Sequence, residues 1–371
     1  MTKTLDIAVL YGDGIGPEVV GETVKVLEAV SDASDDFQLK FTVHLGGAGH
    51  YRDTGIVLDD HVYSACETSD AILFGAAGYY DVRMPDGTEV EGALVFRLRF
   101  GLNLYAGVRP IKYYEGINTS VKEEIIKGAD YVLIRESTEG LYASWGAGAK
   151  VRDELVSDNC IITRAGTTRV TDFAFKLAQQ RASKKQVTCV DKSNVLPSYA
   201  FFRKVYDDVA THYPDIKRDY LYVDAAALEL VMHPKKFDVI VTENMFGDIL
   251  SDLMAATIGG MGLAPSGDIG ENHGLFQPAH GTAPDIMGKN IANPIATILS
   301  GKLMLEWLAN QNPDASTSLL AGARAIDEAV TSLLKDSDIK TPDLGGKAGT
   351  TDMGKAVTEY VANRLRQKAS A

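Results

Sequence analysis

Cysteine is scarce in this chain of 371 residues, with only Cys66, Cys160 and Cys189, an odd number of widely spaced thiols. They fit neither a disulfide framework nor a cysteine-based metal site, so we interpret them as packing residues. Long apolar runs are also missing: none reaches membrane-spanning length, and the N-terminus enters a strand pattern without a signal-peptide core. The sequence therefore predicts a cytoplasmic protein that does not enter a membrane.

Positive charge is in deficit, since 37 lysines and arginines face 50 aspartates and glutamates, for a formal net charge of −13. A nucleic-acid surface needs a clustered basic footprint, so this balance argues against a nucleic-acid partner. A small anionic substrate can still bind through a few local arginines. Because the chain exceeds the usual limit of a single core, about 250–300 residues, two lobes are expected.

Strand and helix patterns alternate along the chain, which is typical of α/β layers. The glycines after the first strand suggest a dinucleotide fingerprint, G-x-G-x-x-G, but its third glycine falls on Pro17, so no Rossmann fold is predicted. Strand-length apolar runs cover residues 4–10, 37–45 and 71–75. Helix patterns cover residues 17–29, 294–309, 321–335 and 352–367.

Asp248 and Asp252 lie four residues apart in the segment GDILSD. On a helix they would share one face and repel each other, unless a hard cation such as Mg²⁺ or Mn²⁺ neutralised them. The alternative is that Asp248 caps the N-terminus of the helix while Asp252 lies in solvent. The pair alone favours this alternative.

The segment HGTAPD, residues 280–285, shifts the balance towards a ligand site. Its glycine and proline flank small polar residues and shape a loop whose backbone N–H groups can meet a polar ligand. Asp285 could accept hydrogen bonds from two ribose hydroxyls. Asn293 has the donor and acceptor needed to read an adenine edge, although Asn-Pro is also an ordinary helix-entry signal.

Together, NMFGDILSDL and HGTAPDIMGKNIANPIATILS resemble the β-decarboxylating dehydrogenases, the family of isopropylmalate, isocitrate, homoisocitrate and tartrate or D-malate dehydrogenases. GDGIGPEV and YVDA extend the resemblance over most of residues 5–365. It implies a two-domain α/β fold of the isocitrate/isopropylmalate dehydrogenase type, with one sheet shared between the lobes. The outer lobe, with the NAD-binding loops, would comprise residues 1–103 and 257–371, and the central lobe, with the metal aspartates and the dimer interface, residues 104–256.

The resemblance also assigns the groups that handle the substrate. Arg99, Arg109 and Arg135 fall where the family has its substrate-carboxylate arginines, and three planar guanidinium groups would hold a malate skeleton. Tyr142 matches the family's proton donor. Lys192 matches the group that helps to take the proton of the substrate hydroxyl.

Asp224 matches the family's third metal aspartate, which completes a carboxylate site for Mg²⁺ or Mn²⁺ with Asp248 and Asp252. In the family, Lys192 and Asp224 act across a dimer interface, so a homodimer with shared active sites is implied. NAD⁺ is expected as the cofactor, because Asp285 would repel a 2′-phosphate. The residues expected to bind it are His280, Gly281, Thr282, Ala283, Pro284, Asp285, Ile286 and Asn293.

The implied reaction is oxidative decarboxylation of a 3-substituted malate, a small dicarboxylic hydroxy acid. Val95 and Phe96 stand where isopropylmalate enzymes have two leucines facing the alkyl group. Because burying an extra carboxylate there is costly, they favour 3-isopropylmalate, converted to 2-oxo-4-methylpentanoate and CO₂ in leucine biosynthesis, or another alkylmalate. Phe96 could equally fill the pocket and leave room only for D-malate or tartrate.

Three departures from the family pattern allow a paralogue with an altered substrate: segment 79–93 is unusual, Gly107 replaces a common Asn, and Gln277 replaces a common Glu. A noncatalytic regulatory subunit of the same fold is an alternative, but the matching arginine, tyrosine, lysine and aspartate residues are all present together. A metal-dependent phosphotransferase is a second alternative. It would need a phosphate-binding lysine motif, which the sequence lacks.

Overall fold

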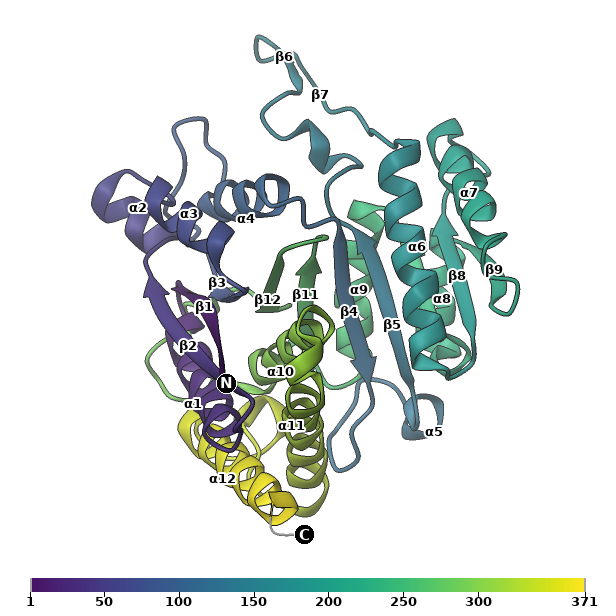
Figure 1. Cartoon of the computed structure of the whole chain (residues 1–371). Coiled ribbons are helices and arrows are strands. Elements are labelled where there is room, and N and C mark those ends of the chain that lie inside the picture. Colours follow the sequence, from purple (N-terminus) through teal and green to yellow (C-terminus); the bar gives the residue numbers. More distant parts are fainter. Residues whose placement is uncertain (1, 370–371) are drawn as a thin grey trace.

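The computed structural model describes residues 2–369, and no helix in that range is both long and apolar enough to cross a membrane. Ten strands form one sheet in the order β2-β1-β3-β12-β11-β4-β5-β10-β8-β9, with helices packed around it (Figure 1). The strands are β1 (Lys3–Gly12), β2 (Phe37–His44), β3 (Ala71–Ala76), β4 (Ala106–Lys112), β5 (Asp130–Glu136), β8 (Gln186–Asp191), β9 (Lys217–Tyr222), β10 (Val239–Thr242), β11 (Pro265–Ile269) and β12 (Gly274–Pro278).

The predicted α/β fold with a single shared sheet is confirmed. Strands β1, β2, β3, β11 and β12 come from the segments expected to form the outer lobe, and the other five come from residues 104–256. The two halves join through the antiparallel pairing of β11 with β4, which sets Asp268 opposite Gly107. The division into lobes stays a prediction, since the sheet runs continuously across the expected boundary.

The helices follow the apolar patterns of the sequence. Pro17 lies in the first turn of the first long helix, where its missing N–H costs nothing, and Val19, Val20 and Leu27 face the core. Figure 1 shows the C-terminal helices packed beside this N-terminal helix. The principal helices are α1 (Gly16–Asp32), α4 (Val90–Gly101), α6 (Arg164–Arg181), α7 (Pro197–Ala210), α8 (Val223–Met232), α9 (Asn244–Thr257), α10 (Ile295–Gln311), α11 (Ser316–Asp336) and α12 (Thr350–Ala369).

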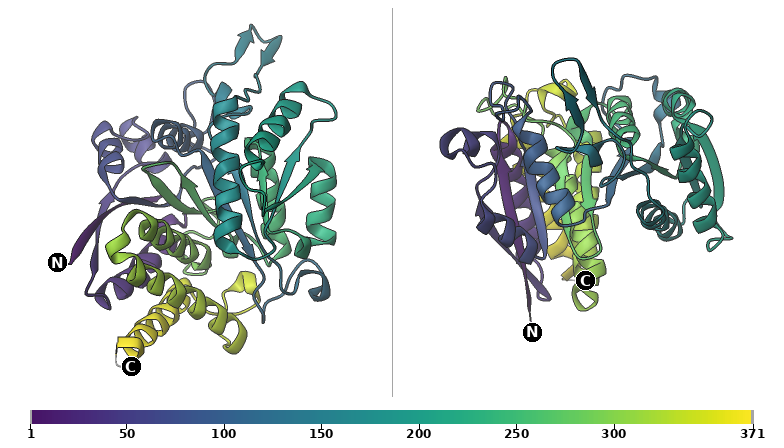
Figure 2. Two further views of the ribbon diagram at one scale, coloured as in Figure 1. Left: turned by 45° about the vertical axis from the view of Figure 1, so that its right-hand side comes forward. Right: turned by 90° about the horizontal axis from the view of Figure 1, so that it is seen from above.

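A two-stranded ribbon, β6 (Ala149–Val151) with β7 (Leu155–Ser157), projects away from the rest of the chain (Figure 2). Its apolar side chains Val151, Leu155 and Val156 are exposed. An isolated two-stranded ribbon is only marginally stable by itself. These side chains give the arm an exposed apolar surface.

Candidate active site

A cavity of about 580 Å³ lies at the seam between the two halves of the sheet. Helix α4 and the end of β3 contribute from one half, and β4, β5 and α9 contribute from the other. Its lining includes most of the predicted catalytic and substrate-binding residues, namely Val95, Phe96, Arg99, Arg109, Arg135, Tyr142, Asp248 and Asp252, together with His280 and Gly281. The tertiary structure thus collects side chains that are far apart in the sequence.

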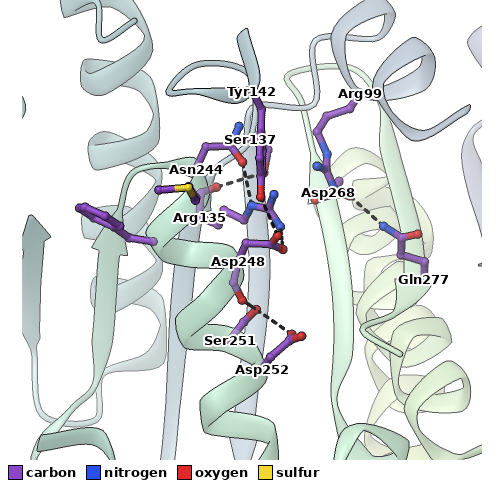
Figure 3. Close-up of polar contacts among 12 residues, drawn as sticks. Arg99, Arg135, Ser137, Tyr142, Asn244, Asp248, Ser251, Asp252, Asp268 and Gln277 are labelled. Carbon is purple, nitrogen blue, oxygen red and sulfur yellow. Dashed lines mark hydrogen bonds and ion pairs between the residues drawn. The ribbon is translucent and has the colours of Figure 1, made fainter. Parts of the chain in front are cut away.

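Helix α9 presents Asp248 and Asp252 on one face, both towards the cavity (Figure 3). The interpretation of Asp248 as the N-cap is wrong, because Glu243 takes that position and its carboxylate accepts from the backbone N–H groups of Met245 and Phe246, at 3.2 and 2.9 Å. Partial burial and the neighbouring Asp248 carboxylate raise the pKa of Asp252. The two carboxylates destabilise each other, and a hard cation would relieve that repulsion.

Arg135 and Tyr142 both contact Asp248. The guanidinium group of Arg135 forms an ion pair with Asp248 and donates from Nε to Asn244 Oδ1 at 2.9 Å. The Tyr142 hydroxyl donates to Asp248 Oδ2 at 3.0 Å, and burial together with this carboxylate raises the pKa of Tyr142. Burial and the nearby Arg99 lower the pKa of Arg135 to about 10, so at neutral pH the arginine is charged while the tyrosine is protonated.

Gly247 allows α9 to approach β5 closely enough for these contacts. A Cβ atom at this position would lie 2.7 Å from the Cβ and Cγ atoms of Arg135, closer than real carbon atoms approach. The glycine inside GDILSD therefore has a packing reason, although glycine disfavours a helix interior by about 1 kcal/mol.

Asp268, on β11, is a site residue that the sequence analysis missed. Its Oδ2 pairs with Arg99 Nη2 at 2.9 Å, with the two side chains only 2% and 5% exposed, and it also accepts from Gln277 Nε2 at 3.1 Å (Figure 3). Burial alone would raise the pKa of Asp268, but the guanidinium groups of Arg99 and Arg109 outweigh it and hold that pKa below its usual value. No local motif marks this aspartate, because only the β11–β4 pairing brings it beneath the arginines.

Gly107 lies opposite Asp268 and leaves room for it. A Cβ atom at position 107 would lie 3.2 Å from Asp268 Oδ1 and 2.8 Å from Ser137 Oγ. Two of the departures from the family pattern, Gly107 and Gln277, therefore flank the same buried carboxylate.

Arg109 differs from the other two arginines because it forms no direct ion pair in the described part of the chain, although Asp252 and Asp268 interact with it at longer range. Arg109 is 7% exposed and lines the cavity. Its side chain forms no hydrogen bond or ion pair within residues 2–369. A buried guanidinium group without a protein partner is costly unless a ligand supplies the anion. The cavity therefore suits a ligand that carries carboxylate groups.

Comparison with known proteins decides the family. The sequence model of isocitrate/isopropylmalate dehydrogenases matches residues 6–357. The chain belongs to this dehydrogenase family. It is 40% identical to the 3-isopropylmalate/3-methylmalate dehydrogenase of Methanocaldococcus jannaschii, over 98% of this chain and 99% of that protein. It is also 40% identical to the 3-isopropylmalate dehydrogenase of Thermobifida fusca, over 98% and 99% of the two chains.

A solved structure gives the same result for the fold. The isocitrate dehydrogenase of Methylococcus capsulatus superposes with a TM-score of 0.82 at 36% identity, covering 96% of this chain and 99% of that one. The predicted resemblance, the enzyme class and the isocitrate/isopropylmalate dehydrogenase fold are confirmed.

Lys192 and Asp224 are not brought to the cavity of this dehydrogenase. They form an ion pair with each other at the ends of β8 and β9, with side chains 29% and 68% exposed. Within residues 2–369, no group of three or more histidine, cysteine, aspartate or glutamate side chains is arranged to hold a metal ion. One copy of the chain therefore brings together two of the three carboxylates expected of a dehydrogenase metal site.

The loop expected to bind the cofactor is anchored to two other turns. Ile15 N–H donates to the Thr282 carbonyl oxygen at 2.8 Å, and Thr282 Oγ1 donates to the Gly78 carbonyl oxygen at 2.9 Å. Burial lowers the pKa of His280, and its Nε2 atom is buried with no hydrogen-bond partner in the described part of the chain. A polar ligand group above the cavity could satisfy this nitrogen.

Asp285 and Asn293 have different surroundings. Asp285 is exposed and free to meet ribose hydroxyls. Asn293 is buried: its Oδ1 accepts from the backbone N–H of Ile295 at 3.0 Å, and its Nδ2 donates to Asp343 at 3.0 Å. The side chain of Asn293 thus already supports the entry of α10, and its contact with an adenine stays a prediction.

We expect the Asp268→Asn variant to raise KM for the anionic substrate about tenfold or more, because a hydrogen bond to a charged group stabilises by about 1.5–3 kcal/mol. KM for the nucleotide cofactor should change little, since Asp268 holds Arg99 and not the loop at residues 280–286. Steady-state kinetics with each reactant varied in turn checks this.

The double variant Asp268→Asn/Gln277→Glu is the control, because it returns a carboxylate to the same place through the neighbouring side chain. It should recover much of the lost substrate affinity. If Asp268→Asn raised both KM values equally, or the double variant recovered nothing, Asp268 would have only a general role in stability.

Proposed function

We propose that this enzyme is an NAD⁺- and divalent-cation-dependent dehydrogenase that oxidatively decarboxylates 3-isopropylmalate, or a close alkylmalate, to a 2-oxo acid and CO₂. The observation that carries the proposal is the cavity, where buried arginines and an aspartate pair lie beside the apolar side chains of Val95 and Phe96. Relatives 40% identical over nearly the whole chain carry the 3-isopropylmalate dehydrogenase name. D-malate or tartrate, and a noncatalytic role, are less favoured.

Arg109 and Arg99 would bind the substrate carboxylates. Arg109 forms no ion pair in the described part of the chain, and Arg99 uses only Nη2 for its ion pair with Asp268. Two buried guanidinium groups with free N–H groups would orient the malate skeleton, and orientation removes part of the entropic barrier of the reaction. Arg135, held by Asn244 and Asp248, would complete the cationic end of the site.

Tyr142 would act as the acid. Its raised pKa keeps the hydroxyl protonated at neutral pH, and its bond to Asp248 fixes its direction, so it can protonate C3 once CO₂ has left. When bound, the cation would supply Lewis-acid stabilisation of charge on the C2 oxygen, while NAD⁺ would take the hydride from C2. Asp248 and Asp252 have the hard oxygen ligands that Mg²⁺ and Mn²⁺ prefer.

A homodimer would complete the site. Leu228 and Met232 on α8 and Ile249 on α9 are 62%, 48% and 60% exposed, an apolar surface that favours a partner. Lys192, just after β8, and Asp224, at the beginning of α8, lie on the same side of the chain, away from their own cavity. In a twofold dimer they could reach the partner's cavity and supply the missing base and third carboxylate.

NAD⁺ is proposed over NADP⁺ because Asp285 is an exposed carboxylate in the loop that follows β12. A carboxylate accepts from free ribose hydroxyls and repels a 2′-phosphate.

The proposed function is tested by offering NAD⁺, Mg²⁺ or Mn²⁺ and a set of acids: 3-isopropylmalate, D-malate, tartrate, isocitrate and homoisocitrate. NADH absorbance and CO₂ release should both show a clear preference for 3-isopropylmalate. A preference for D-malate or tartrate would mean that Phe96 fills the alkyl pocket. Inactivity with every acid would contradict the enzymatic function.

Removal of the cation should abolish activity. Because Asp248 and Asp252 repel each other without a cation, treatment with EDTA should stop NADH formation, and added Mg²⁺ or Mn²⁺ should restore it.

The Asp252→Asn variant should bind Mn²⁺ at least about tenfold more weakly in calorimetry, since it loses a charged ligand. Asp60→Asn, at an exposed carboxylate, is the matched control and should bind Mn²⁺ like the wild type. Full activity in EDTA would contradict the prediction.

A further inference from the structure

Trp145 lines the cavity and packs against α4, although no sequence motif marks it. It follows a short 3₁₀ helix, Tyr142–Ser144, in the connection between β5 and α6. Its ring packs on Phe96 with centroids 4.9 Å apart, and Phe96 in turn stacks on Phe100 at 5.1 Å. Phe96 is therefore held between its helix neighbour and an indole from the other half of the sheet.

Gly92 makes the contact between the indole and α4 possible. It lies one turn before Phe96 on α4, and a Cβ atom there would lie 2.5 Å from the Cη2 atom of Trp145. No other residue could stand at position 92 without displacing the ring. The indole thus occupies space that a side chain on α4 would normally fill.

The indole also separates two hollows. Trp145 lines the active-site cavity and, on its other side, a groove of about 310 Å³. The other residues of the groove are Met84, Pro85, Asp86, Thr88, Ala93 and Gly146. The residue is 42% exposed and lines both hollows, so it is not a core residue.

We propose that Trp145 is a specificity-determining residue: with Gly92 and Phe96 it closes the outer end of the pocket for the C3 substituent. This inference rests on the proposed function, which places that substituent beside Val95 and Phe96. The wall is apolar, so it suits malates with a compact branched alkyl group at C3. Longer unbranched chains would meet the indole, which bars them from the groove beyond it.

The closing experiment compares wild type with Trp145→Ala and Gly92→Ala on 3-methyl-, 3-isopropyl- and 3-n-hexylmalate. Trp145→Ala should join the cavity to the groove and raise the kcat/KM ratio of hexyl to isopropyl substrate about tenfold or more, since small changes in an apolar pocket are worth about 10–200-fold. Gly92→Ala pushes the ring towards the cavity or the groove and should lower kcat/KM for the isopropyl compound. If Trp145→Ala lowered kcat/KM equally for all three acids, the tryptophan would be a packing residue and the inference would be overturned.

Fluorescence supplies a readout that does not depend on turnover. The chain has two tryptophans, and Trp307 is only 7% exposed in the core. With Mg²⁺ and NADH present, 3-isopropylmalate should change the emission of the wild type more than D-malate does, and Trp145→Phe should lose this difference. Equal changes in wild type and variant would overturn the inference.

A wild-type enzyme that oxidises no 3-alkylmalate would contradict the proposed function, and this outcome is distinct from failure of the inference about Trp145. In that case, a Trp145→Ala variant that gained activity on these acids would still identify the indole as the barrier. A variant that stayed inactive on them would overturn the inference as well.

Discussion

The Lys192→Ala variant should lose about 10²–10⁴-fold in kcat, the usual contribution of a positioned acid or base. Tyr142→Phe should lose activity in the same range, because it removes the proposed proton donor. Yet only Tyr142 lines the cavity of its own chain, whereas Lys192 pairs with Asp224 away from it. If each site takes its lysine from the partner, the two inactive variants should complement each other.

Mixing the two variants after reversible dissociation provides the measurement. At equal concentrations about half of the dimers would be mixed, and each mixed dimer would have one intact site, so about a quarter of wild-type activity should return. A mixture of Lys192→Ala with Asp224→Asn is the control. In a mixed dimer of these two variants, each site would receive from its partner either a missing Lys192 or an altered Asp224. No intact site could therefore form. Complementation in the control, or none in the test mixture, would contradict a shared site.

The Arg109→Gln variant should lower kcat/KM for the substrate by about 10²–10³-fold, because truncating one partner of a buried charge pair costs about 2–5 kcal/mol. Arg109 forms no ion pair in the described part of the chain, although the carboxylates of Asp252 and Asp268 are near enough to interact with it electrostatically. Arg99 and Arg135 each form an ion pair with an aspartate, so the substrate carboxylate would be the first direct ion-pair partner of Arg109. Kinetics with substrate and NAD⁺ varied separately should place the loss on the substrate.

Arg97→Gln is the matched control on the neighbouring helix α4. Arg97 pairs with the exposed Asp60 and donates to the Leu58 carbonyl oxygen, both at 2.5 Å, outside the cavity. A surface pair of this kind contributes only about 0–1 kcal/mol to stability. Its kcat/KM should stay close to that of the wild type. A similar loss in both variants would mean that Arg109 acts through folding and not through the substrate.

Local periodicity was sufficient for much of the fold. The apolar runs at residues 4–10, 37–45 and 71–75 became β1, β2 and β3, and the i, i+4 spacing of Asp248 and Asp252 placed both carboxylates on one face of α9. The start of α9 was less certain. The sequence suggested Asp248 as a possible N-cap, whereas the helix begins five residues earlier, after Glu243.

The site residues that lie outside the sequence motifs could be identified only from the folded chain. Asp268 reaches Arg99 because β11 pairs with β4, and Trp145 reaches Gly92 because the β5–α6 connection crosses the cavity towards α4. Asn293 shows the reverse case. Its amide is buried and bonds to Ile295 N–H and Asp343, contacts that the sequence did not indicate, and its contact with an adenine stays a prediction.

The sequence by itself determined the family and the α/β class and pointed to the arginine, tyrosine and aspartate residues as candidates, because short-range spacing and residue type are written directly in it. Only the tertiary structure decided which arginine forms no ion pair, which carboxylate pairs with Arg99, and which aromatic ring lines the cavity beside Phe96. These features depend on strand order and on contacts between segments far apart in the chain. No local pattern records such contacts, since their energy arises only when the two halves of the sheet meet.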